Sequence, residues 1–222
     1  MKKAIIIFIA FIFCFQLAGK AQKARVGLTG GVEIANLSRT IGGQDKDGDY
    51  RIGIAGGMLV DIPFGKKQNL SFQPSVEYVQ KGAAEQAQAP VNKAYTALRY
   101  AEFFPGVTYN KKCGKTKSST FYIGAGPFVD FNLPSKKVAH IPGNNIETEV
   151  SFGDQVANDF RGIDYGGRAI IGYRTAMGLF VSLNYTQGAR NLAPVDNGDK
   201  IKSIAFGIRL GYLFKATQTP KK

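Results

Sequence analysis

Charged side chains recur inside segments of the sequence that otherwise alternate between apolar and polar residues. In an extended segment, successive side chains point to opposite faces, so each of these charges shares a face with small and polar neighbours. Carboxylates and guanidinium groups gathered on one face could pair as ions, relay protons or hold a small charged ligand. The candidate residues are Glu33, Arg51, Asp61, Glu77, Glu102, Asp130, Arg168 and Arg209.

We expect these side chains to form a structural network of ion pairs inside a narrow barrel. About eight strands enclose a lumen that is only wide enough for side chains to fill. Unpaired buried charge is costly, so the charges must find partners; Arg209, for example, is expected to pair with an acid such as Glu102. A proton path, a small-ligand site and an open pore are the alternatives.

Catalysis and metal binding find little support in the sequence. The single histidine, His140, falls in the longest expected loop without a nucleophile motif beside it. Cys113 lies among lysines that would favour its thiolate, but in what we expect to be a plain turn. The acidic run 45–49 resembles a calcium loop, yet Tyr50 and Gly56 stand where an EF-hand needs glycine and glutamate. We predict no enzyme activity, cofactor or metal, with loose binding of a divalent ion at 45–49 as the alternative.

The elements that would position these charges are strands. In the run 204–214, every even position is large and apolar, while most odd positions are small or charged. The same alternation returns about eight times, at lengths near the ~9–11 residues of a tilted membrane strand. We predict an all-β, about eight-stranded antiparallel transmembrane barrel with apolar faces toward lipid; a soluble, lipocalin-like barrel is the alternative. The segments are 25–37, 50–62, 70–81, 95–109, 121–133, 164–174, 177–187 and 204–214.

The connections between these segments alternate between short and long. Short turns are expected at 64–69, 111–118 and 174–176, and long loops at 38–49, 82–94, 134–163 and 189–200. This asymmetry is typical of outer-membrane barrels, with short periplasmic turns and long extracellular loops. Proline removes a ladder donor, so we expect Pro74, Pro105 and Pro127 to lie at bulges or near a rim.

The chain begins with features of an export signal. Two lysines precede a short apolar run, and small residues stand before a cleavage point after Ala21. We therefore predict a signal peptide at 1–21, a barrel domain at 22–215 and a short basic tail at 216–222. The predicted location is the outer membrane. An uncleaved anchor, or a lipoprotein attached through Cys14, are the alternatives.

The composition limits the partners. The 222 residues carry a formal net charge of +13, but no nucleic-acid-binding motif accompanies it, so we predict no nucleic-acid partner. Lipid phosphates or cell wall would suit the basic surface. After cleavage only Cys113 would remain, so no internal disulfide is expected. We expect a monomer in contact with outer-membrane lipid, with envelope or secretion proteins as further partners.

Several runs resemble one known family. The run 98–105, LRYAEFFP, resembles the Leu-x-Tyr-x-Glu-x-Pro signature of the PorT-like outer-membrane β-barrels of Bacteroidetes. The runs 72–82, 124–127 and 209–214 are similar to the preceding, fifth and last strands of that family. The resemblance implies an outer-membrane barrel. PorT itself is associated with protein secretion across the outer membrane, while most relatives have no assigned activity.

The expected function is a non-catalytic outer-membrane barrel that acts through its loops in structure, adhesion or assembly. The resemblance adds a link to protein secretion as one option. A barrel that binds or transports a small amphiphile is the alternative from another class. An outer-membrane enzyme that modifies lipids is the third.

Overall fold

A computed structural model describes residues 24–46, 48–85, 91–113, 119–195 and 198–214. The predicted signal peptide at 1–21 and the predicted tail at 216–222 lie outside these residues. Within the described part of the chain, no helix is long and apolar enough to cross a membrane.

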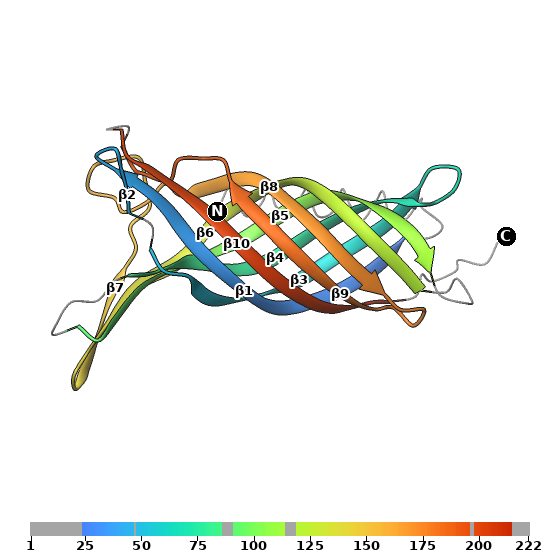
Figure 1. Cartoon of the computed structure of the whole chain (residues 1–222), viewed down its shortest axis with the longest axis horizontal. Coiled ribbons are helices and arrows are strands. Elements are labelled where there is room, and N and C mark those ends of the chain that lie inside the picture. The colour runs from blue at the N-terminus through green and yellow to red at the C-terminus, as the bar shows by residue number, and fades with distance from the viewer. Residues whose placement is uncertain (1–23, 47, 86–90, 114–118, 196–197, 215–222) are drawn as a thin grey trace.

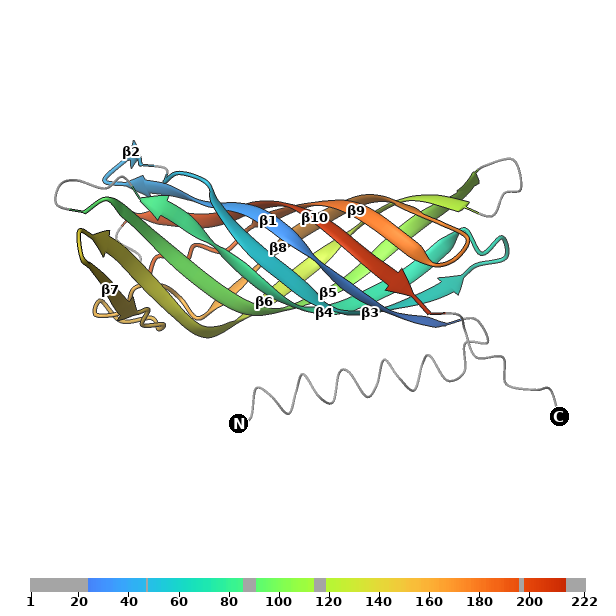
Figure 2. The same ribbon diagram turned by 90° about the horizontal axis from the view of Figure 1, so that it is seen from below.

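Eight long antiparallel strands wind around one axis and close on themselves (Figures 1 and 2). The first long strand pairs with both the second and the last, in register from Gly27↔Leu213 to Thr40↔Lys200 on the closing side. The predicted all-β antiparallel fold is therefore confirmed. The long strands are β1 (Arg25–Ile41), β3 (Arg51–Phe64), β4 (Leu70–Glu85), β5 (Lys93–Cys113), β6 (Ser119–Ile141), β8 (Ile163–Arg174), β9 (Leu179–Gly188) and β10 (Lys200–Leu213).

The outer wall is apolar, as the alternation predicts. On β10, Phe206, Ile208 and Leu210 are exposed at 48%, 49% and 64%, while Arg209 between them is 2% exposed. Monomeric soluble proteins rarely expose so continuous an apolar surface, and such surfaces mark contact with membrane or protein. One inward glycine allows β1 and β10 to approach closely beside Arg209: a Cβ on Gly31, its cross-strand neighbour, would lie 1.9 Å from the Ile208 carbonyl oxygen.

The strands run further at the long-loop end than the alternation predicts. β4 reaches Glu85, β5 starts at Lys93, and β6 continues to Ile141 before turning back as β7 (Asn144–Glu149). The prediction of one long loop over 134–163 was therefore wrong. All residues of β7 are exposed, so backbone pairing with β6 defines the hairpin rather than an apolar face. Figure 1 shows β7 projecting from the barrel at the end that also carries β2 (Gln44–Asp45).

The prolines lie within strands, not at bulges. Pro74 is the register partner of Pro105 across β4 and β5, and the register is unshifted there. The neighbouring ladders lack pairs instead, between Leu59↔Ser75 and Ile62↔Phe72 and between Phe103↔Val129 and Val107↔Ala125. The prediction of bulge or rim positions was wrong, because a gap in one ladder accommodates the missing donor without an extra residue.

Candidate functional site

The candidate site is the barrel lumen, where charges from six strands meet. Arg209 on β10 donates from Nη2 to Glu33 Oε2 at 3.0 Å and from Nε to Glu77 Oε2 at 3.1 Å. All three side chains are at most 3% exposed. The structure thus pairs Arg209 with Glu33 and Glu77, and not with Glu102 as expected from sequence.

Arg168 on β8 joins this pair to the next carboxylate. Its Nη1 donates to Glu77 at 2.9 Å and to Glu102 at 2.7 Å, while Nε and Nη2 donate to Asn184. Its guanidinium carbon lies 4.8 Å from the centre of the Phe104 ring. One planar cation therefore bridges two carboxylates from neighbouring strands, a geometry for which arginine is suited.

Lys81 on β4 extends the chain of pairs, and it is a residue that the sequence reasoning missed. Its Nζ donates to Glu102 at 3.1 Å and to Asp130 at 2.6 Å, and it lies 4.2 Å from the centre of the Phe128 ring. The signal was present: Lys81 is four residues after Glu77, on the same face of the same strand. We call Glu33, Lys81, Glu77, Glu102, Asp130, Arg168 and Arg209 the lumen cluster.

Asp164 lies beside the lumen cluster and was also missed. It is the cross-strand register partner of Asp130, and Ser203 donates a short hydrogen bond to it. Both aspartates are fully buried, and each keeps one Oδ1 atom that accepts no hydrogen bond from the described residues. The Tyr100 hydroxyl is likewise buried without a described partner. Asp164 shares the face of Arg168, so alternation could have found it.

Asp61 belongs to a second, separate group at the short-turn end. It is fully buried and pairs with Arg25 at 2.5 Å and with Arg174 at 3.4 Å. Neither arginine was predicted, although Arg174 shares the face of Arg168. The expected single network is therefore two groups, because Asp61 lies near the short-turn end of β3 (Arg51–Phe64), away from the lumen cluster.

Arg51 joins neither group, which corrects the prediction of a lumen-facing charge. Its guanidinium carbon lies 5.1 Å from the centre of the Tyr95 ring, and no described carboxylate pairs with it. Tyr95 adjoins Thr96, which is fully buried on the opposite, inner face of β5. The Arg51 side chain therefore lies on the outer surface of the barrel and extends toward β5. Its place at the first residue of β3 lets it do so.

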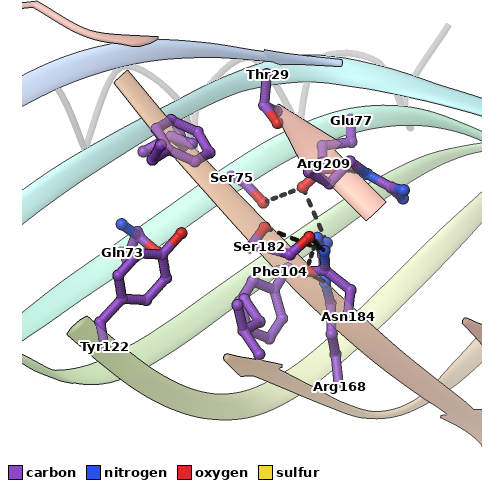
Figure 3. Close-up of a pocket in the computed structure, with 13 residues that line it drawn as sticks. Thr29, Gln73, Ser75, Glu77, Phe104, Tyr122, Arg168, Ser182, Asn184 and Arg209 are labelled. Carbon is purple, nitrogen blue, oxygen red and sulfur yellow. Dashed lines mark hydrogen bonds and ion pairs between the residues drawn. The ribbon is translucent and has the colours of Figure 1, made fainter. Parts of the chain in front are cut away.

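Little free space remains beside the lumen cluster. A cavity of about 20 Å³ lies between the Glu77, Arg168 and Arg209 side chains and an aromatic layer that includes Phe104 and Tyr122 (Figure 3). Such a volume holds about one water molecule. Toward the short turns, Leu59, Phe180 and Leu213 form a further apolar layer.

The long-loop mouth is closed by an apolar cluster, which we call the mouth cluster. Strand residues such as Leu37 and Leu98 meet Val150, Phe160 and Leu192, which come from the connections after β7 and β9. Leu37, Leu98 and Leu192 are fully buried. The connection after β7 thus folds back over the lumen, and the charged layer is sandwiched between apolar layers.

The other residues considered for chemistry lie apart. His140 is in the β6–β7 hairpin, where its Nδ1 is 2.6 Å from the Asn145 side-chain oxygen. Cys113 ends β5 with a free thiol. Asp47 of the run 45–49 lies outside the described residues. Among the described residues, no group of three or more histidine, cysteine or acidic side chains is arranged to hold a metal ion.

The chain belongs to the outer membrane protein beta-barrel domain family, whose model matches residues 20–193. This family places the protein in the outer membrane, in agreement with the apolar outer wall. No curated protein sequence matches the chain.

Solved structures with similar folds include two outer-membrane barrels. Neisserial surface protein A is 11% identical with a TM-score of 0.45, over 85% of this chain and 97% of that one. The attachment invasion locus protein Ail of Yersinia pestis, in complex with the heparin analogue sucrose octasulfate, is 10% identical with a TM-score of 0.41, over 86% and 99%.

Proposed function

We propose that this protein is a sealed, non-catalytic scaffold in the outer membrane, which acts in structure, adhesion or assembly through its elements beyond the membrane. The observation that carries the proposal is the filled lumen. Buried ion pairs cross it, an apolar cluster covers its mouth, and the cavity beside the charges has about 20 Å³. A transported solute would need a far larger path.

The elements at the long-loop end support the second half of the proposal. β5 and β6 run beyond the barrel wall, and β6 turns back into the wholly exposed β7. A paired strand with exposed side chains and one unpaired edge is a surface that another chain can join by strand addition. A barrel that served only as a membrane plug would not need this projection.

The narrower parts of the proposal rest on sequence. The start of the chain supports export through a signal peptide cleaved after Ala21. The run 98–105 supports kinship with the PorT-like barrels of Bacteroidetes, and with it a role in protein secretion. We expect outer-membrane lipid and envelope or secretion proteins as partners, and a monomeric barrel.

Conductance tests the sealed lumen. Folded protein in planar lipid bilayers should give no steady ionic current, under conditions in which a porin measured in parallel conducts. Stable channels of porin size would overturn the scaffold and support the transport alternative.

Replacement of residues 139–146 by a tight turn tests the projecting hairpin and leaves Lys137 and Val138 in place. The shortened chain should fold and insert as well as the wild type, yet fail to restore surface attachment and envelope integrity in cells that lack the protein. Full restoration by the shortened chain would show that the hairpin is dispensable.

A further inference from the structure

The displaced Arg51 points to a second site, on the outer wall at the long-loop end of the apolar band. Ile52 and Ile54, which follow Arg51 on β3, are 69% and 55% exposed and lie on the lipid-facing wall. Tyr95 lies under the Arg51 guanidinium at 5.1 Å. Tyrosine is typical of the border between the apolar band and the head groups, so this position lies at head-group depth.

A second arginine, Arg99, lies on the outer wall close to Arg51. Arg99 on β5 is flanked by Leu98 and Tyr100, both fully buried toward the lumen, so its own side chain lies on the outer wall. Its guanidinium group lies within electrostatic range of Arg51, as do the hydroxyl groups of Tyr95 and Tyr78. Two like charges side by side are unfavourable unless an anion lies between them or close by.

The described carboxylates do not supply that anion. Neither arginine forms an ion pair with a described acidic residue, and Glu147, whose carboxylate is within electrostatic range of Arg99, is already held by Lys136 at 2.5 Å. Arg51 Nη1 and Arg99 Nε are buried, yet neither nitrogen donates a hydrogen bond to a described residue. Buried guanidinium donors without acceptors are costly.

The surrounding donors suit a phosphate. The Tyr78 hydroxyl accepts a hydrogen bond from the Gln80 side chain at 2.7 Å, which leaves its own proton for an oxygen acceptor. Gln80 is the register partner of Arg99, so this hydroxyl is close to both arginines. Guanidinium groups bind phosphate oxygens in pairs, and the ring of Tyr95 keeps Arg51 in place by cation–π contact.

We propose that Arg51, Arg99 and Tyr78 form a binding site on the outer wall for the phosphate group of an outer-leaflet lipid head group. The lipid chains would lie along the apolar wall below, next to Ile52 and Ile54. The site is separate from the lumen and independent of the proposed scaffold role. It would fix the height of the barrel in the membrane.

Lipid titration tests the site. Protein folded in a maltoside detergent is titrated with diphosphorylated lipid A, with the same lipid after removal of its phosphates, and with inorganic phosphate, and bound lipid is counted by native mass spectrometry. The wild type should bind the phosphorylated lipid selectively. Arg51→Gln and Arg99→Gln should each weaken binding about tenfold, the loss expected for one charge-assisted hydrogen bond.

Matched variants separate the site from general charge and from misfolding. Lys67→Gln removes one exposed cation at the opposite end of the barrel and should change affinity less than about twofold. The double variant Arg51→Lys, Arg99→Lys keeps the charge and should bind between wild type and the glutamine variants. A heat-dependent shift in gel mobility reports folding of each variant.

Several results would overturn the proposal. These are equal binding of the dephosphorylated lipid, an equal loss in Lys67→Gln, and unchanged binding in the folded glutamine variants. Inorganic phosphate bound as tightly as the lipid would also overturn it, because the site would then serve a free ion and not a head group.

Discussion

At the scale of single residues, the lumen cluster depends on cations that each serve two carboxylates. Arg209 is the only described partner of Glu33, whereas Glu77 is also held by Arg168. Removing Arg209 therefore leaves Glu33 as an uncompensated buried charge. Breaking a buried pair in this way costs far more than the net value of the pair.

Arg209→Leu should destabilise the folded barrel by about 3–5 kcal/mol because Glu33 loses its partner. Adding Glu33→Gln should recover part of that loss, while Glu77→Gln should recover less because Arg168 still pairs with Glu77. The measurement is urea unfolding from lipid vesicles for the three variants. Equal rescue by both glutamine changes would contradict this division of partners.

Leu210, which follows Arg209 in the sequence, lies on the opposite, lipid-facing side of β10. Leu210 is 64% exposed on the outer wall, so Leu210→Arg should cost about 2–4 kcal/mol if it lies at mid-membrane and about 0–1 kcal/mol near an interface. Leu210→Ala should cost less than an arginine at mid-membrane, because lipid fills around the smaller side chain. Urea unfolding of both variants from lipid vesicles reports how deep position 210 lies in the membrane. A harmless Leu210→Arg together with a harmless Arg209→Leu would show that the faces are assigned wrongly.

Alternation predicted which residues face inward, but it could not predict their partners. The face on which a side chain lies follows from the period of two along its own strand. The partner that it meets depends on how neighbouring strands are staggered around the barrel. This is why Glu102 was expected opposite Arg209, while the structure gives it Lys81 and Arg168. Arg51 shows the limit of the rule, because a long side chain near a strand end can reach around the wall.

At the scale of elements, the connection after β7 is built as a cover. Phe160 and Val150 enter the mouth cluster, and Asp159 beside them accepts hydrogen bonds from Lys137 of β6 and from the Ser151 amide. The Asp159 carboxylate thus links two parts of this connection to each other and also links the connection to β6.

The pKa of Asp159 makes this fastening sensitive to acid. Partial burial would raise the pKa, but the bonds from Lys137 and Ser151 outweigh it and lower the pKa below its usual value. A lowered folded pKa means that the stabilisation is complete above the unfolded pKa of about 3.9 and is lost as the pH falls through the folded value. At neutral pH the fastening is therefore intact.

Hydrogen exchange over residues 151–160, corrected for intrinsic rates, should be constant down to about pH 4 and should rise as the pH falls further. Asp159→Asn should exchange faster throughout and lose the pH dependence. Exchange that is independent of pH in the wild type would argue against this role for Asp159.

The sequence predicted the eight membrane strands but not these outer elements. The residues of the barrel wall can be recognised in the sequence because lipid-facing positions are apolar and lumen-facing positions are small or polar. β7 has no such contrast, since all of its side chains are exposed, and Phe160 and Leu192 lie in connections outside the alternating segments. Their burial comes from contacts with distant segments, which a local pattern does not record.

At the scale of the whole molecule, the protein is a barrel turned inside out. Large apolar side chains are exposed on the outer wall along β1, β3, β5, β6, β8, β9 and β10, and ion pairs fill the centre. The family match supports the same arrangement. A soluble barrel with the same strands would place Phe206, Ile208 and Leu210 inside and the charges outside.

Tryptophan quenching tests that arrangement most directly, since the chain contains no tryptophan and every signal comes from the introduced residue. Leu183→Trp and Leu210→Trp probe the outer wall, and Phe180→Trp probes the lumen beside Leu59 and Leu213. Each variant is folded into vesicles whose acyl chains carry bromine, which quenches on contact. We predict strong quenching at 183 and 210 and little at 180. Equal quenching at all three positions, or quenching at 180 alone, would contradict the inside-out barrel.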